Sequence, residues 1–251
     1  MRAPGASVVS GLRAIDRGSP TLEGVRDEWN AYVTAMEAAG VLVEPLPALD
    51  EFPDSIFVED PALVFPEGAI VLRPGAPSRL GEAEMMAPEL RRRFDVVLEL
   101  PTGFVEGGDV LTTTREVLIG LSERTNEAGA RSLQGLLEQL GRKGRIVTTP
   151  QGVLHFKTDC SLLDEETILA TERLAASGVF EGYRVVLTPE GEEAAANSLR
   201  VNDRVFVGSG FPRTTDQLTA AGHRVVTLPN EQIALLDAGF SCLSLRWRGP
   251  V

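Results

Sequence analysis

The side chains best suited to covalent chemistry in this chain are a thiol, an imidazole and a set of carboxylates. Cys242 and His155 could act as nucleophile and proton carrier, because a thiolate is strongly nucleophilic and an imidazole titrates near neutral pH. The carboxylates stand at Asp54, Glu59, Asp60 and Glu106. Carboxylates bind the N–H groups of a planar cation in a forked geometry. Together these groups predict thiolate attack on a guanidinium carbon, with histidine protonating the amine that leaves.

These residues follow a short apolar segment that ends in proline and recurs five times. The copies are residues 41–47, 96–101, 146–150, 185–189 and 225–229. Their closing prolines are separated by 54, 49, 39 and 40 residues. Glu106, His155, Asn197 and Cys242 each follow a different copy. If the repeats are equivalent in space, these side chains converge on one cavity.

Taken singly, the same residues also have structural interpretations. A cysteine such as Cys242 is often a small buried side chain, and His155, between Leu154 and Phe156, could be a core histidine. Their matching positions in successive repeats favour a shared chemical role. Cys160 has no such position, and we expect it in the core.

Periodicity predicts the elements that position the site. Apolar residues at helical spacing predict a helix over 22–36 that ends before Gly40, and another over 126–141 with Asn126 at its start. Further strands are expected at 117–119, 167–169 and 204–207. The repeating unit is therefore strand, strand, helix, strand. One unit cannot bury its own apolar face, so we expect an α/β fold of five ββαβ repeats closing into a five-bladed propeller, one domain over residues 1–251.

The composition of the chain limits the classes of molecule that it is expected to bind. The net charge of −12 over 251 residues argues against nucleic acid and anionic membranes and is compatible with a small cationic substrate. Two cysteines cannot form a disulfide framework, and the N-terminal residues show no signal peptide, so a cytoplasmic location is expected. The chemistry needs no cofactor, and no His/Cys cluster has metal-ligand spacing. A homodimer is compatible with the sequence but not required by it.

Six stretches in order resemble one known family, the dimethylarginine dimethylaminohydrolases of the guanidino-group-modifying (pentein) superfamily of five-bladed α/β propellers. They are residues 52–60, 73–79, 105–109, 122–126, 154–158 and 242–246. The resemblance implies hydrolysis of Nω-methylated arginine to citrulline and an amine. Cys242 would form a covalent thiouronium intermediate, and His155 would protonate the amine and then activate water. Glu106 and Asp60 would hold the guanidinium.

The resemblance also implies contacts to the rest of the substrate. Asp54 and Glu59 would shape the guanidinium pocket. Arg79 and Arg124 would bind the α-carboxylate, a role that suits a rigid bidentate cation. Backbone carbonyls at Leu12 and Leu236 would bind the α-amine. One glycine usual in the family is replaced by Ala238, which would cost about 1 kcal/mol if that position needed a positive φ.

Two other functions are compatible with parts of the pattern. Arginine deiminases and amidinotransferases resemble this chain in fold and nucleophile, but deiminases place an aspartate two residues after the histidine, where this chain has Lys157. They also carry an inserted helical domain for which this chain has no room. A non-catalytic propeller that binds a large partner would not need Cys242, His155 and Glu106 together.

Overall fold

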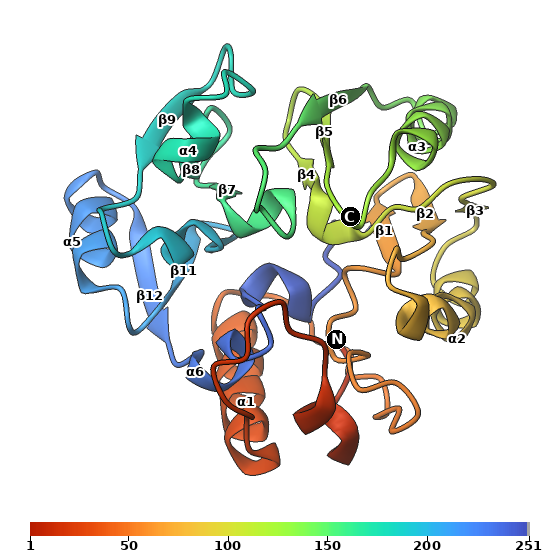
Figure 1. Cartoon of the computed structure of the whole chain (residues 1–251), viewed down its shortest axis with the longest axis horizontal. Coiled ribbons are helices and arrows are strands. Elements are labelled where there is room, and N and C mark those ends of the chain that lie inside the picture. The colour runs from red at the N-terminus through yellow and green to blue at the C-terminus, as the bar shows by residue number, and fades with distance from the viewer. Residues whose placement is uncertain (250–251) are drawn as a thin grey trace. The chain divides into compact units, whose positions relative to one another are not determined.

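The computed structural model describes residues 1–249, and their elements follow the chain order that Figure 1 colours from red to blue. The α-helices are α1 (Leu22–Ala38), α2 (Leu80–Arg91), α3 (Glu127–Gln139), α4 (Glu172–Ala175), α5 (Pro212–Ala220) and α6 (Glu231–Ala234). The strands are β1 (Ala62–Phe65), β2 (Gly68–Val71), β3 (Val97–Glu99), β4 (Val110–Thr112), β5 (Val117–Leu121), β6 (Gly144–Thr148), β7 (Cys160–Leu162), β8 (Thr167–Ala170), β9 (Arg184–Leu187), β10 (Leu199–Val201), β11 (Arg204–Gly208) and β12 (Arg224–Leu228).

These strands form four three-stranded sheets with one shared topology. The first two strands of each sheet pair antiparallel through a short turn, and the third pairs parallel to the second. A parallel neighbour requires a crossover connection, which α2, α3, α4 and α5 supply in turn. The predicted order of strand, strand, helix, strand is confirmed in these four repeats, as is the α/β class.

The remaining predicted repeat, which contains the first apolar segment of the chain, departs from that pattern. Residues 41–47 form no extended strand, and only Leu46 pairs, in an isolated parallel bridge with Arg2. The prediction of a strand there was wrong, because Pro45 and Pro47 lack the N–H groups that a ladder needs. The crossover is nevertheless kept, since α1 lies between the two bridged residues in the chain.

The contacts divide the chain into two compact units. The first unit contains Met1–Ile56 and Lys157–Ser241, with the β7–β8–β9 and β10–β11–β12 sheets. The second unit contains Phe57–Phe156 and Cys242–Val251, with the β1–β2–β3 and β4–β5–β6 sheets. Organisation as one domain and closure into a five-bladed ring stay predictions.

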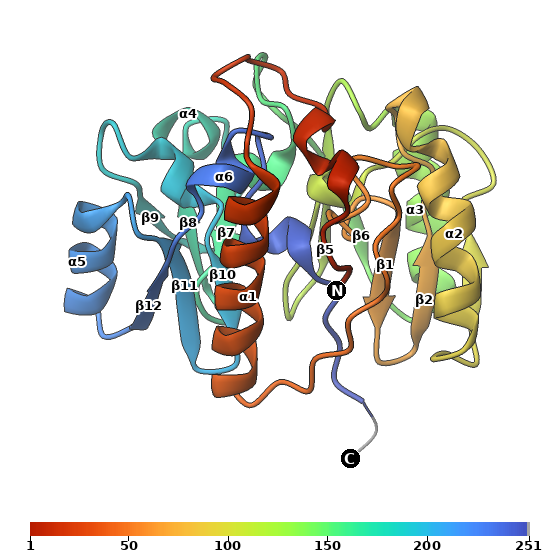
Figure 2. The ribbon, with the colours of Figure 1, turned by 90° about the horizontal axis from the view of Figure 1, so that it is seen from below.

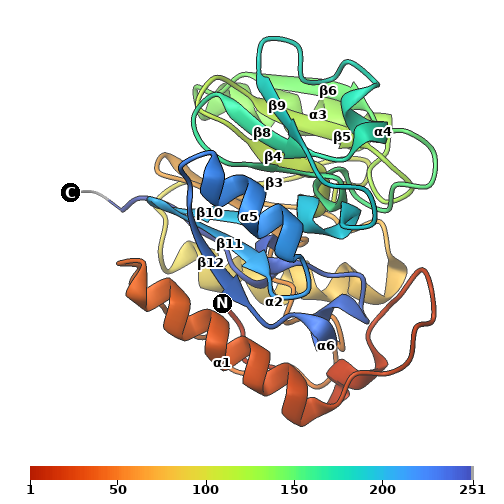
Figure 3. The same cartoon turned by 90° about the vertical axis from the view of Figure 1, so that its left-hand side faces the viewer.

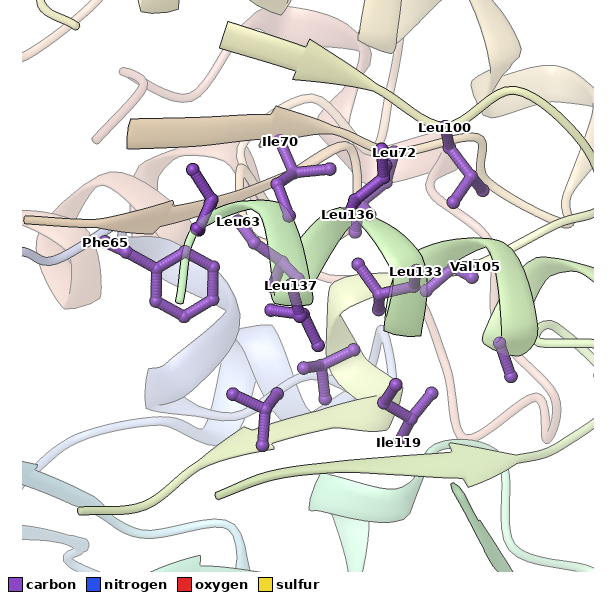
Figure 4. Close-up of a cluster of buried hydrophobic side chains, with 14 residues drawn as sticks. Leu63, Phe65, Ile70, Leu72, Leu100, Val105, Ile119, Leu133, Leu136 and Leu137 are labelled. Carbon is purple, nitrogen blue, oxygen red and sulfur yellow. The ribbon is translucent and has the colours of Figure 1, made fainter. Parts of the chain in front are cut away.

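The core of the second unit is built around α3, whose apolar face is drawn in Figure 4. Leu133 and Leu137 on this helix are fully buried, and they pack with Ile70 of β2 and Ile119 of β5. Asn126 caps α3 as predicted, with its side chain accepting the N–H of Gly129 at 2.8 Å. The turn directly before this cap carries Arg124, one of the predicted site residues. In the same unit, Figure 2 shows α2 beside the hairpin of β1 and β2.

In the first unit, two helices cover apolar strands. Leu218 of α5 packs with Val205 and Val207 of β11, and Figure 3 shows α5 lying along the β10–β11–β12 sheet. Tyr32 of α1 stacks on Phe240, with ring centroids 5.8 Å apart. The buried Glu28 accepts the N–H groups of Gln232 and Ile233 at 2.7 and 2.9 Å, which fixes α6 against α1. Within residues 1–249, none of the helices combines the length and apolar character required to cross a bilayer.

The packing of α3 yields a stability prediction. Leu137→Ala should lower the free energy of unfolding by about 2–5 kcal/mol, since the surrounding core cannot fully collapse into the space left behind. On the same helix Gly135 is exposed, and an added methyl group there meets no atom within 4 Å. Gly135→Ala should therefore raise stability by about 0.5–1 kcal/mol. Urea unfolding followed by circular dichroism measures both, and equal effects of the two variants would contradict this account of the core.

Candidate active site

Seven of the ten predicted site residues belong to the second unit. They are Glu59, Asp60, Arg79, Glu106, Arg124, His155 and Cys242. Leu12, Asp54 and Leu236 belong to the first unit. Each group is held by contacts within its own unit.

Asp60 lies just before β1, and its buried carboxylate accepts hydrogen bonds from two kinds of donor. Its Oδ2 is paired with the guanidinium of Arg79, and its Oδ1 accepts the N–H of Gly108 at 2.9 Å. Burial alone would raise the pKa of Asp60, but the charges of Arg79 and His155 outweigh it and lower the pKa below the ordinary value. Asp60 therefore stays an anion inside the unit, as a group that binds cations must.

The turn Glu106-Gly107-Gly108-Asp109 approaches its neighbours so closely that its middle residues cannot carry side chains. A Cβ on Gly107 would lie 2.0 Å from the carbonyl oxygen of Glu59, and one on Gly108 would lie 2.7 Å from Nδ1 of His155. Gly107 donates its N–H to the carbonyl oxygen of Asp60 at 3.2 Å. The two glycines thus allow the segments of Glu59, Glu106 and His155 to meet.

His155 lies between β6 and the 3-10 helix η4 (Phe156–Thr158), and its ring is bound by Glu106. The distance from its Nε2 to Oε2 of Glu106 is 2.7 Å. Glu106 is fully buried, and its other oxygen accepts the N–H of Ala76 at 3.1 Å. The carboxylate is therefore fixed from two sides before it orients the imidazole.

The charges around His155 favour its protonated form. Burial lowers the pKa of His155, but the hydrogen bond with Glu106 and the charges of Asp109, Asp60 and Glu106 outweigh it and raise the pKa to about 9. At neutral pH the ring is therefore an imidazolium whose Nε2–H donates to Glu106. A group in this state can give a proton to a leaving amine.

The two predicted carboxylate-binding arginines are in different states. Arg79 is buried, and its guanidinium binds both oxygens of Glu82 as well as Asp60. Arg124, in the turn between β5 and α3, has a side chain 24% exposed, and its Nη1 lies 3.5 Å from Glu106. Arg124 is the more accessible of the two to an anionic group of a ligand.

Cys242 lies in the 3-10 helix η6 (Phe240–Leu243) and is buried. Its carbonyl oxygen accepts the N–H of Glu59 at 3.3 Å. Arg246, four residues later, places Nη2 3.4 Å from Oε1 of Glu59 and also binds the carbonyl and hydroxyl oxygens of Ser244. The segment of the predicted nucleophile is thereby tied to the Glu59–Asp60 pair. Cys160, as predicted, is a core residue: it is buried in β7, and burial raises the pKa of its thiol.

In the first unit, the three remaining predicted residues adjoin Gly11. The N–H of Leu12 donates to Oδ1 of Asp54 at 2.9 Å. A Cβ on Gly11 would lie 2.9 Å from that oxygen and 3.3 Å from Cδ2 of Leu236. Leu12 itself is 38% exposed. These contacts place Leu12, Asp54 and Leu236 together, while their roles in substrate binding stay predictions.

Backbone strain near the nucleophile is one residue away from the position considered in the sequence. Asp237, with a φ of 54°, takes the left-handed conformation, and Ala238 is not among the positive-φ residues of the described chain. An acidic residue tolerates this conformation better than alanine does. The carboxylate of Asp237 also accepts the N–H of Ala14 and pairs with Arg17 at 3.0 Å.

Asn197 is the amide residue that follows the fourth apolar segment. Its side-chain oxygen accepts a hydrogen bond from the hydroxyl of Ser241 at 3.2 Å.

Two features of the site were missed by sequence reasoning. Asp109 closes the Glu-Gly-Gly-Asp motif but was given no role, although its carboxylate is buried and its charge helps to raise the pKa of His155. The possible ligand atoms of Asp60, Glu106 and His155 also lie within 4.8 Å of one another, a spacing that could hold a metal ion. The motif itself could have pointed to Asp109. The convergence of these three side chains was predicted, but a metal-compatible spacing had no sequence signal, because they come from three separate repeats.

The geometry predicts how His155 titrates. An NMR titration of its ring protons should give a midpoint near 9, and Glu106→Gln should lower that midpoint because it replaces the anionic partner with a neutral one. His155 should be identified by the loss of its signals in His155→Gln. An unchanged midpoint in Glu106→Gln would contradict the assignment of Glu106 as the partner.

The same raised pKa has a consequence for stability, with a definite sign. Because the folded value of about 9 exceeds the ordinary value of 6.5, this contribution is fully present below pH 6.5 and is lost as the pH rises through 9. Its size is about 3 kcal/mol. Urea unfolding of the wild type and Glu106→Gln across this range measures it, and a wild-type profile no steeper than that of the variant would contradict the expectation.

Known proteins resemble this chain over most of its length. The arginine deiminase family model matches residues 34–199. The chain is 36% identical to an N(G),N(G)-dimethylarginine dimethylaminohydrolase of Pseudomonas aeruginosa, over 98% of this chain and 97% of that protein. It is 31% identical to a protein of the same name from Streptomyces coelicolor, over 88% and 85% of the two chains.

Solved structures give the same result. The Pseudomonas aeruginosa enzyme, crystallised as a cysteine-to-serine mutant complexed with citrulline, superposes with a TM-score of 0.94 at 36% identity, over 98% of this chain and 96% of that one. A histidine-to-glycine variant of dimethylarginine dimethylaminohydrolase, an adduct with S-methyl-L-thiocitrulline, gives a TM-score of 0.93 at the same identity, over 98% and 97% of the two chains. This chain therefore belongs to the dimethylarginine dimethylaminohydrolase family.

Proposed function

We propose that this chain hydrolyses Nω-methylated arginine to citrulline and dimethylamine or methylamine. The observation that carries the proposal is the ring of His155 held at 2.7 Å from the buried Glu106, with Asp60 beside them, in a member of this family. Anions of this kind bind a guanidinium, and an imidazolium supplies the proton that its leaving amine requires. The Pseudomonas aeruginosa relative in complex with citrulline adds support for the product.

In this proposal the carboxylates bind the substrate cation. Glu106 and Asp60 hold its N–H groups, and Glu59 shapes the same pocket from the adjacent position in the chain. Buried carboxylates interact more strongly with a cation than exposed ones, because little water screens them. Asp60 keeps its charge for this purpose through Arg79.

The covalent steps follow from the remaining two groups. The thiolate of Cys242 attacks the guanidino carbon, and His155 gives its proton to the departing dimethylamine, which leaves a thiouronium bound to Cys242. His155, now neutral, takes one proton from water as the water attacks the same carbon. Collapse of this adduct expels the thiolate, and the remaining hydroxyl proton passes through solvent to the released amine, which gives citrulline and dimethylammonium. Each step leaves His155 in the protonation state that the next one needs.

The substrate α-carboxylate is assigned to Arg124, with Arg79 as its predicted companion. Arg124 is partly exposed, which supports a direct contact, whereas the guanidinium of Arg79 already binds Glu82 and Asp60. The predicted contacts of Leu12, Asp54 and Leu236 are part of the same proposal. So are the five-bladed ring, a homodimer and the absence of a cofactor.

A second candidate is arginine deiminase activity, which the match of that family model to residues 34–199 favours. Against it stands Lys157, a buried cation two residues after His155 where the deiminases resemble one another in having an aspartate. Citrulline formation from dimethylarginine, monomethylarginine and arginine, with identification of the amine released, separates the two. We expect the methylated substrates to have the higher kcat/KM, and a preference for arginine with release of ammonia would overturn the proposal.

The nucleophile is tested by trapping the intermediate. Acid quenching during turnover, followed by peptide mass spectrometry, should find the amidino adduct on the peptide that carries Cys242. Cys242→Ser should abolish the adduct and lower kcat by about a thousandfold or more. Cys160→Ser, a change at the buried thiol of β7, is the matched control and should still form the adduct. An adduct on another residue, or none in a rapidly quenched sample, would contradict the covalent route.

A further inference from the structure

The carboxylate of Asp109 is completely buried and receives three hydrogen bonds. Its Oδ1 accepts the main-chain N–H of Phe156 at 2.8 Å. Its Oδ2 accepts the hydroxyl of Ser122 at 2.7 Å and the hydroxyl of Thr125 at 2.6 Å. None of these donors is a predicted substrate contact, so Asp109 is a feature separate from the guanidinium pocket.

Each of the three donors is coupled to a different residue of the proposed active site. Phe156 directly follows His155. The hydroxyl of Thr125 accepts the N–H of Glu106 at 3.1 Å, and the hydroxyl of Ser122 accepts the N–H of Arg124 at 3.0 Å. One carboxylate therefore connects the main chains of the proton carrier, its partner and the arginine assigned to the α-carboxylate.

Another repeat has an aspartate at the equivalent position with different partners. Asp159 precedes β7 as Asp109 precedes β4, and it accepts the hydroxyl of Thr171, the N-cap of α4, at 2.9 Å. Asp159 is also paired with the guanidinium of Arg173. At Asp109 the donors are two hydroxyls and a main-chain N–H, and the carboxylate faces an imidazole instead.

We propose that Asp109 is a positioning residue, which holds His155, Glu106 and Arg124 in one arrangement through Phe156, Thr125 and Ser122 without touching the substrate. The inference rests on the proposed function for its kinetic consequences. Its physical basis is that hydroxyls and an N–H group bonded to one buried carboxylate have little freedom, and that displacement of a catalytic group by about 1 Å can slow a reaction about a hundredfold.

The test compares Asp109→Asn with Asp159→Asn, a matched pair of isosteric changes at buried carboxylates. In Asp109→Asn an amide N–H₂ replaces one acceptor oxygen, so at least one donor loses its partner. We expect both variants to lose stability in urea. Only Asp109→Asn should lower kcat for dimethylarginine, by about tenfold to a hundredfold. A stability loss with wild-type kcat and KM would overturn the proposal.

Single-donor variants resolve the arrangement and guard against a poorly folded Asp109→Asn. Ser122→Ala frees the turn of Arg124, so it should raise KM more than it lowers kcat. Thr125→Val releases the N–H of Glu106, so it should lower kcat more than it raises KM. The separate connections proposed here would be wrong if both variants changed kcat and KM in the same ratio. They would also be wrong if neither variant changed kcat or KM.

The titration of His155 in the ligand-free protein gives a readout that needs no substrate. The charged groups that face this ring are Glu106, Asp60 and Asp109. The His155 midpoint should fall in Asp109→Asn and stay at the wild-type value in Asp159→Asn. A wild-type protein that failed to hydrolyse methylated arginine would refute the proposed function alone. An unchanged midpoint in Asp109→Asn would refute the role of Asp109.

Discussion

The arrangement of the second unit depends on how it accommodates buried negative charge. Asp60, Glu106 and Asp109 are each at most 3% exposed. An ionised carboxylate without partners in such surroundings would be strongly destabilising, by several kcal/mol or more. Each has its own solution: Arg79 for Asp60, the His155 ring for Glu106, and two hydroxyls with a main-chain N–H for Asp109. The imidazolium is therefore part of what lets the acidic cluster fold.

This explains why structure and chemistry cannot be separated at His155. The same carboxylates that require a cation nearby raise the pKa of the ring to about 9, so that a proton is already in place for a leaving group. A cationic substrate entering the cluster would bring a second positive charge close to the imidazolium. Repulsion between the two favours proton transfer away from the ring. In the proposed reaction, these carboxylates would both bind the substrate and prepare the acid that acts on it.

Local pattern was enough to predict most of the elements. The leucines of α3, its Asn126 cap and the strands at β5, β8 and β11 were all readable, because helical and strand periodicities are properties of neighbouring residues. The strand predicted over residues 41–47 was wrong. Two prolines in this segment lack N–H groups, and its pairing is limited to one bridge at Leu46. The condition considered for Ala238 does not arise, because the positive φ of this segment lies at Asp237, whose carboxylate also contacts Ala14 and Arg17.

The sequence by itself predicted the reacting groups, which stay a prediction, and it determined the ββαβ repeat of four sheets and the family to which the chain belongs. Only the tertiary structure decided which atoms pair: that Arg79 is held by Asp60 and Glu82, that Gly108 makes room for the ring of His155, and that Asp109 connects three separate segments. A motif records residue types along one segment. The partners of a buried charge come from other segments of the chain, and their identity is set by which segments meet within about 3 Å, the distance at which a hydrogen bond forms.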